Sequence, residues 1–103
     1  MIIHTLLAIA DDTPITLTDL TVSGWGRALI FRGLAGERPF TLTFDDCREM
    51  RWRIYAHLDV SEPTPLVEFA PGRDQHRSPA QMLTGHFGLS VFYGALHAHW
   101  HAA

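Results

Sequence analysis

Large apolar side chains alternate with polar ones from Phe40 to His57, on both sides of an acidic break. Successive side chains of a β-strand point to opposite faces, so this period of two predicts two half-buried strands. A helix is excluded because Met50, Trp52 and Ile54 would be scattered around its circumference. One face of the two strands should therefore contribute to a core, through Phe40, Leu42, Phe44, Met50, Trp52, Ile54 and Ala56.

Turn residues divide the rest of the chain into further short strands. The apolar phase slips near Asp19, which predicts a bulge there, and the apolar stretch Ile2 to Ala10 suits either a buried strand or a short helix. The other predicted strands are Ile15 to Val22, Arg27 to Arg32, Leu66 to Ala70 and a long aromatic strand from His86 to the end. Short turns favour antiparallel pairing of consecutive strands, so we predict a mainly β single domain (residues 1–103), an antiparallel meander that closes into a small barrel or sandwich.

One short helix is expected before the last strand. Ser78 would cap it, Pro79 would take the first helical position, and Gln81 would complete a capping box. Gly85 would end the helix in a left-handed conformation. Gly85 and Gly88 fit no phosphate-binding loop and are interpreted as turn glycines.

Composition excludes several classes of function. All eight basic residues are Arg, and without Lys there can be no Schiff-base chemistry and no phosphate loop of the nucleotide-hydrolase type. A formal charge of −3 argues against nucleic-acid binding. The apolar start is too short to span a bilayer and lacks a preceding basic residue, so we expect no membrane partner and a cytoplasmic location. Arg without Lys is typical of GC-rich genomes, and we expect a bacterial protein.

Three histidines at alternate positions near the end, His97, His99 and His101, would share one face of a strand. A bulge at Gly94 would turn this row to solvent, and its imidazoles could then bind Zn²⁺ or Ni²⁺. No other cofactor is predicted. The alternative is a solvated terminal strand without a metal.

A second candidate site is the face opposite the Trp52 row. Arg51, Arg53, Tyr55 and His57 lie on it, and two guanidiniums with an aromatic side chain could hold a phosphate or carboxylate. The alternative is pairing with carboxylates such as Glu68 on a solvated sheet face. Trp52 itself should be largely buried, so that Trp52→Ala would cost about 3–5 kcal/mol.

The acidic break could bind a cation or act as acid and base through Asp45, Asp46 and Glu49, although paired aspartates are also ordinary turn residues. Cys47 between them is expected to be a small buried apolar residue, and it forms no internal disulfide because it is the only cysteine. No catalytic residue is predicted from these groups.

The leading expectation is therefore a β module, more a binding protein than an enzyme, that acts by self-association or by binding a protein partner. A homodimer through the long aromatic C-terminal strand is predicted, since an unpaired edge invites pairing. One alternative is a small ligand-binding barrel or enzyme with an anion site at Arg51, Arg53, Tyr55 and His57. Another is a metal-binding protein that uses His97, His99 and His101.

Overall fold

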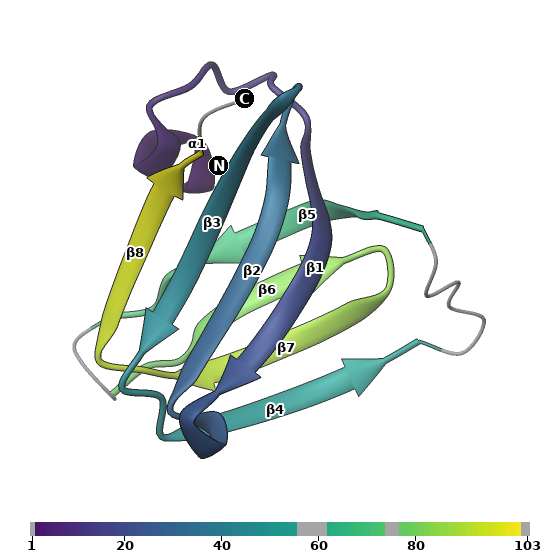
Figure 1. Cartoon of the computed structure of the whole chain (residues 1–103). Helices are drawn as coiled ribbons and strands as arrows, with labels where there is room; N and C mark the ends of the chain where they lie inside the picture. Colours follow the sequence, from purple (N-terminus) through teal and green to yellow (C-terminus); the bar gives the residue numbers. More distant parts are fainter. Residues whose placement is uncertain (1, 56–61, 74–76, 102–103) are drawn as a thin grey trace.

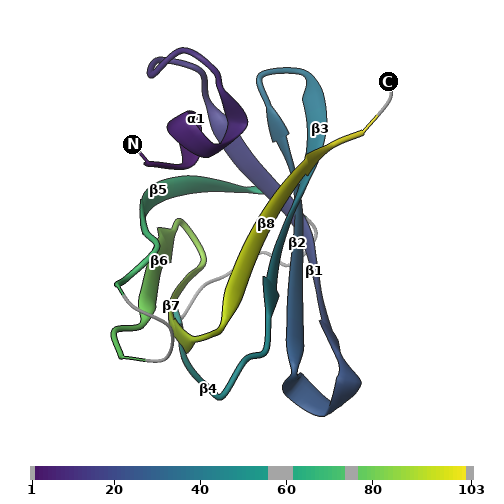
Figure 2. The same cartoon turned by 90° about the vertical axis from the view of Figure 1, so that its left-hand side faces the viewer.

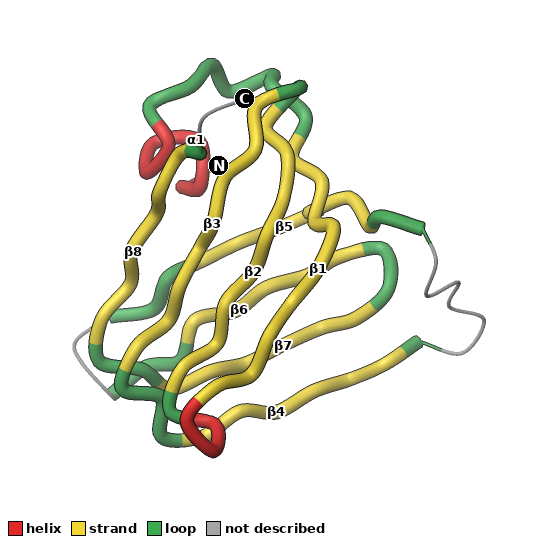
Figure 3. The backbone as a smooth tube through the Cα atoms, viewed as in Figure 1, coloured by secondary structure: helices red, strands yellow, loops and turns green. Residues whose placement is uncertain are grey.

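The computed structural model of the chain describes residues 2–55, 62–73 and 77–101, most of which lie in β-strands (Figure 1; Figure 3). The elements are α1 (Ile2–Leu7), β1 (Ile15–Ser23), the 3-10 turn η1 (Gly24–Gly26), β2 (Ala28–Ala35), β3 (Arg38–Asp45), β4 (Glu49–Ile54), β5 (Thr64–Ala70), β6 (Ala80–Thr84), β7 (Phe87–Phe92) and β8 (Ala95–Trp100). The strands form one eight-stranded antiparallel sheet in the order β4-β7-β6-β5-β1-β2-β3-β8. The predicted mainly β antiparallel fold is confirmed.

The sheet bends so that β1, β2, β3 and β8 lie across β5, β6, β7 and β4 (Figure 1; Figure 2). The two halves are joined by a short ladder in which Thr16 pairs with Pro65 and Leu17 with Thr64. Beyond this ladder β1 pairs only with β2 among the described strands. The order of strands has two ends, β4 and β8, so the predicted closure into a barrel or sandwich is not shown.

The core lies between the two halves and is built mainly from aromatic rings. Phe31 of β2 stacks on Phe87 of β7 with ring centroids 6.2 Å apart, and Phe44 of β3 packs at the same distance against Phe69 of β5. Phe40, Leu42 and Phe44 are all buried, so the predicted core face of this strand is confirmed. The register shift between Leu17 and Asp19 also confirms the predicted bulge.

The N-terminal stretch forms the helix α1, one of the two structures that its composition allowed. Ile3 and Leu7 lie one turn apart and are both buried, which places one side of α1 on the core. His4 is buried beside them, and its Nε2 is 2.7 Å from the carbonyl oxygen of Thr13. The helix contacts β5 and β8, which belong to different halves of the sheet, and so covers one end of the core.

The predicted helix before the last strand is wrong, because this segment is β6. Ala80, Met82 and Thr84 alternate with exposed residues and are buried between β5 and β7. The Thr84 hydroxyl accepts hydrogen bonds from the N–H groups of His86 and Phe87, which fixes a hairpin turn. Packing of these side chains between β5 and β7 stabilises a strand more than the capping residues stabilise a helix, since capping is only a local preference.

The simple meander is also wrong, because three pairs of consecutive strands, β3–β4, β4–β5 and β7–β8, are not neighbours in the sheet. β4 pairs with β7 instead of β3, and β8 pairs with β3 instead of β7. After β3, the buried Cys47 donates its backbone N–H to the carbonyl of Arg27, which turns the chain away from a β3–β4 hairpin. The predicted long last strand is correspondingly two strands, β7 and β8, separated at Tyr93 and Gly94.

Trp52 is not largely buried, contrary to the prediction. Its side chain is 37% exposed, although its ring packs against Phe87 at 5.3 Å. Ile54, further along the same face of β4, is 58% exposed. The faces were assigned correctly, since Arg51 and Arg53 point to solvent, but β4 leaves the core as it runs and is covered by little else that the structure describes.

Candidate functional site

A groove of about 460 Å³ lies on the outer face of the sheet, over β4, β7 and β6. Two small residues of β7, Gly88 and Ser90, form its floor because the odd-numbered residues of this strand face the core. Arg53 pairs with Gly88 across the β4–β7 ladder, and Arg51 pairs with Ser90. The two arginines predicted as a site therefore form one wall of an actual groove.

The opposite wall comes from β6 and β5. Gln81 pairs with Ser90, and the Ser90 hydroxyl donates a hydrogen bond of 2.8 Å to the side-chain oxygen of Gln81. Leu83 pairs with Gly88 and is 37% exposed, which adds an apolar patch to this wall. Glu68 lines the groove as well, but the structure records no ion pair between it and the arginines, so the predicted alternative of a neutralising pair is not seen.

Tyr55 completes the arginine wall at the end of β4. Its hydroxyl oxygen lies 3.8 Å from the position that a Cβ on Gly88 would occupy, so the phenol reaches over the groove floor. His57, the fourth predicted member of this site, lies outside the described residues. The structure thus brings together Arg51, Arg53 and Tyr55 of the predicted set.

The charge in the groove is only partly compensated. The Arg51 guanidinium is 3.5 Å from a carboxylate oxygen of Glu49, and both side chains are at least half exposed. Exposed ion pairs contribute only about 0–1 kcal/mol, so Glu49 holds Arg51 weakly. Arg53 forms no ion pair or hydrogen bond with the residues that the structure describes. As far as the described residues show, both guanidiniums are available to a carboxylate or phosphate, which they can bind in a bidentate manner.

Sequence reasoning missed a second cavity, which lies on the inner side of β4. This cleft of about 280 Å³ opens between β4 and β1. Its apolar lining comes from both halves of the sheet and consists of Leu17, Leu20, Phe31, Trp52, Ile54 and Phe87. The slip at Asp19 was the available signal, because a bulge changes the course of a strand and can part it from a neighbour.

The predicted histidine row has the expected exposure. His97, His99 and His101 point to solvent, while Leu96, Ala98 and Trp100 pack against the core. The turn at Gly94, instead of a bulge within one strand, produces the change of phase. The row lies on the outer face of β8 beside β3, well separated in the sheet order from β4.

The contacts of the row are with β3. His97 Nε2 is 3.3 Å from a carboxylate oxygen of Asp45, and His101 contacts the Thr41 hydroxyl. The rings of His97 and His99 are nearly parallel, with centroids 6.5 Å apart. Among residues 2–55, 62–73 and 77–101 there is no group of three or more candidate ligands close enough to hold a metal ion. Binding of Zn²⁺ or Ni²⁺ here stays a prediction, and it would require the side chains to move.

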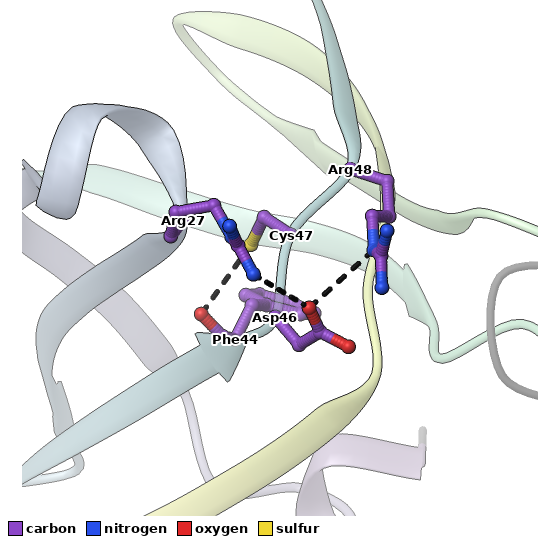
Figure 4. Close-up of polar contacts among 5 residues, drawn as sticks. All are labelled: Arg27, Phe44, Asp46, Cys47 and Arg48. Carbon is purple, nitrogen blue, oxygen red and sulfur yellow. Dashed lines mark hydrogen bonds and ion pairs between the residues drawn. The ribbon is translucent and has the colours of Figure 1, made fainter.

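The acidic break lies in the connection from β3 to β4, which joins the two halves of the sheet, and its contacts hold this connection in place. Asp46 has a positive φ of 54°, and one of its carboxylate oxygens lies 3.3 Å from Arg27 and 3.4 Å from Arg48 (Figure 4). A Cβ on Gly94 would come within 2.7 Å of the other carboxylate oxygen, so this turn requires glycine. These contacts give Asp46 a structural role in the crossing.

Cys47 is buried, as predicted, and its thiol donates to the Phe44 carbonyl at a distance of 3.4 Å (Figure 4). Burial raises the pKa of the thiol, and the negative charges of Asp45 and Asp46 raise it further. Because the thiolate is the nucleophilic form, this environment disfavours the reactive form of Cys47.

Comparison of the chain with protein-family models and with curated proteins gives no match. Within the described ranges, no helix has the length and apolar character needed to cross a bilayer. The assignment of a function therefore depends on the geometry of the two cavities that flank β4.

Proposed function

We propose that this protein is a non-enzymatic binding module that holds an acidic segment of a partner protein against β4. The observation that carries the proposal is the arrangement of Arg51 and Arg53 side by side along one strand, both with exposed side chains. Carboxylates at alternate positions of an extended chain have about the same spacing, roughly 7 Å, as alternate residues of β4. An extended acidic segment can therefore meet both guanidiniums at once.

The local charge favours such a partner although the whole chain has a formal charge of −3. Interactions between exposed charges fade over roughly 8 Å at physiological salt, so the nearest charges dominate. Tyr55 adds an amphipathic side chain of the kind that is enriched at protein interfaces. A binding role is also supported over catalysis by the burial of Cys47, which raises the pKa of its thiol, and by the structural use of Asp46.

The proposal is tested by calorimetric titration of the protein with a short blocked peptide in which glutamate and valine alternate. Reversing both charges, with Arg51→Glu and Arg53→Glu, should weaken binding roughly tenfold or more, and added salt should weaken binding to the unaltered protein. Arg32→Glu is the matched control, since Arg32 is an exposed strand residue on β2 in the other half of the sheet. Binding that is absent, or equal in all three proteins, would contradict the proposal.

A homodimer through β8 is a second candidate function. β8 pairs only with β3 among the described strands, which leaves its other side as an end of the sheet. Two copies could join there through backbone hydrogen bonds in a two-fold arrangement. Light scattering should then show a dimer at a concentration of tens of micromolar, and a proline at Ala98 should convert it to a monomer. A monomer under these conditions would remove this candidate.

A further inference from the structure

The other end of the sheet, β4, presents backbone groups that no described strand uses. β4 pairs with β7 alone within the described residues. Tyr55 donates its N–H to the carbonyl of His86, with which it is in register. Hydrogen-bonded pairs alternate along an antiparallel ladder, so the odd-numbered residues of β4 direct their backbone groups to β7. The N–H and C=O groups of Met50, Trp52 and Ile54 consequently point to the free edge.

The side chains on the inner face of this edge are incompletely covered. Exposure rises along the strand from Met50, which is half-buried, to Trp52 at 37% and Ile54 at 58%. Trp52 and Ile54 also line the cleft between β4 and β1. Across the cleft, β1 from Asp19 onward pairs only with β2 in the part of the chain that the structure describes. An added strand would therefore find apolar surface on the same side as its inward side chains.

The outer face of the same edge has the opposite character. Arg51 and Arg53 alternate with the inner residues and are both exposed. A strand added beside β4 would place its own alternate side chains next to these guanidiniums. Carboxylates there would form cross-strand pairs of opposite charge, which stabilise a sheet, whereas basic side chains would repel the arginines.

We propose that a partner segment binds by adding a ninth strand to the free edge of β4, antiparallel to it, with acidic side chains outward against Arg51 and Arg53 and apolar side chains inward over Trp52, Ile54 and the cleft. This inference rests on the proposed function and specifies its geometry. The segment supplies the hydrogen-bonding partners that Met50, Trp52 and Ile54 do not find among the described strands. Its sequence should alternate acidic and apolar residues. The positive charge on the outer face of β4 favours the acidic residues, and the exposed apolar inner face favours the apolar ones.

Edge addition and binding in the outer groove make different demands on the ligand backbone. Directly opposed residues of antiparallel strands point to the same face. The inward valines of the alternating peptide would therefore face Met50, Trp52 and Ile54 and exchange backbone hydrogen bonds with them, while the glutamate N–H groups would point to solvent. A peptide that lies in the groove over Gly88 would use its side chains and show no such alternation.

The test uses two versions of the alternating peptide, one N-methylated at the valines and the other at the glutamates, in calorimetric titrations of the full chain. Methylation at the valines should weaken binding at least tenfold, whereas methylation at the glutamates should change it less than threefold, since only one set of N–H groups is used. Equal affinities of the two methylated peptides, whether high or low, would overturn edge addition. A peptide in which lysine replaces glutamate should bind much more weakly than the acidic one.

Gly88→Val supplies the complementary test on the protein. A Cβ at this position meets only the Tyr55 hydroxyl, at an ordinary distance of 3.8 Å, so the variant should fold while its side chain fills the groove floor. Edge addition predicts peptide affinity within threefold of the unaltered protein, and loss of binding would place the segment in the groove instead. These outcomes differ from failure of the proposed function itself, in which no acidic peptide binds or charge reversal at Arg51 and Arg53 has no effect.

Discussion

The two ends of the sheet, β4 and β8, differ in how well the rest of the molecule supports them. The inner residues of β8 pack against the core, and α1 lies beside the strand. Trp100 is held between Phe40, at a ring distance of 6.4 Å, and the Arg38 guanidinium, 3.9 Å above its ring. On β4, by contrast, exposure of the inner residues increases along the strand.

This difference shows that alternating apolar and polar side chains do not by themselves place an edge strand firmly on the core. Both strands alternate apolar inner residues with polar outer ones. The inner residues of β8 all pack against the core, whereas on β4 Met50 does so and Trp52 and Ile54 are exposed. An edge that keeps apolar side chains exposed and backbone groups unpaired is a site where another strand can pair. The comparison therefore supports the recognition role that we propose for β4, whereas the inner residues of β8 help to complete the core.

The largest expected effect separates the core near β8 from the surface at β4. Phe44→Ala should lower the free energy of unfolding by about 3–5 kcal/mol, because Phe44 is completely buried and contacts three other rings. Trp52→Ala should cost only about 1–2 kcal/mol, since part of its side chain remains in water. Urea denaturation measures both, and equal losses would break the comparison. Trp25→Ala is the control, because Trp25 is fully exposed.

Replacing two glycines by alanine should change the free energy of unfolding by smaller amounts and in opposite directions. Gly94→Ala should cost about 1–3 kcal/mol, since its Cβ would clash with Asp46 at the turn into β8. Gly88→Ala, on the outer face near β4, meets no close atom and should stabilise the protein by about 0.5–1 kcal/mol. A tolerated Gly94→Ala would show that the crossing into β8 is less constrained than its geometry indicates.

The pH dependence of stability above neutrality should come from the crossing into β8. Burial raises the pKa of the Cys47 thiol and of the Tyr93 hydroxyl. An acid whose pKa is raised by folding stabilises the protein fully below its unfolded pKa, about 8.5 for cysteine and 10 for tyrosine, and this contribution is lost as pH rises through the folded value. The free energy of unfolding should therefore fall from about pH 8 to pH 11.

Variants separate the two contributions to this alkaline loss. Cys47→Ala should make the first part of the decrease shallower, and Tyr93→Phe the second part. Trp52→Ala should leave the slope unchanged, since β4 contributes neither group. A slope that is the same in Cys47→Ala and in the unaltered protein would contradict the assignment.

The smallest expected effect is metal binding at the histidine row. Zn²⁺ should bind weakly, because the nearly parallel rings of His97 and His99 do not converge on one point. The affinity should fall in acid, because only the neutral imidazole binds the metal. Calorimetry of the native protein and of a His97→Ala/His99→Ala variant decides the matter. Equal heats from both, or none from either, would remove a metal site from β8.

The faces of the strands could be predicted from sequence, because the period of two is a local property of the chain. It correctly gave the buried row of β3, the outward arginines of β4 and, through the slip at Gly94, the exposed histidines of β8. The bulge near Asp19 followed from the same reasoning.

The pairing partners could not be predicted, since periodicity does not specify which strand lies alongside. The incorrect β3–β4 and β4–β5 pairings of the meander follow from this, as does the overestimated burial of Trp52 at a position where the core becomes thin. Gly88 was interpreted as a turn residue, whereas it lies within β7 and makes the groove possible. A small residue inside a strand has this meaning only once its neighbours, Arg53 and Leu83, are known.

Amide hydrogen exchange by NMR tests the recognition role of β4 most directly. In the free protein the N–H groups of Met50, Trp52 and Ile54 should exchange quickly, while those of Arg51 and Arg53, which point to β7, are protected. Saturation with the alternating acidic peptide should slow exchange at the three even-numbered residues and leave β8 unchanged. Protection of these amides already in the free protein, or unchanged fast exchange in the complex, would contradict the account.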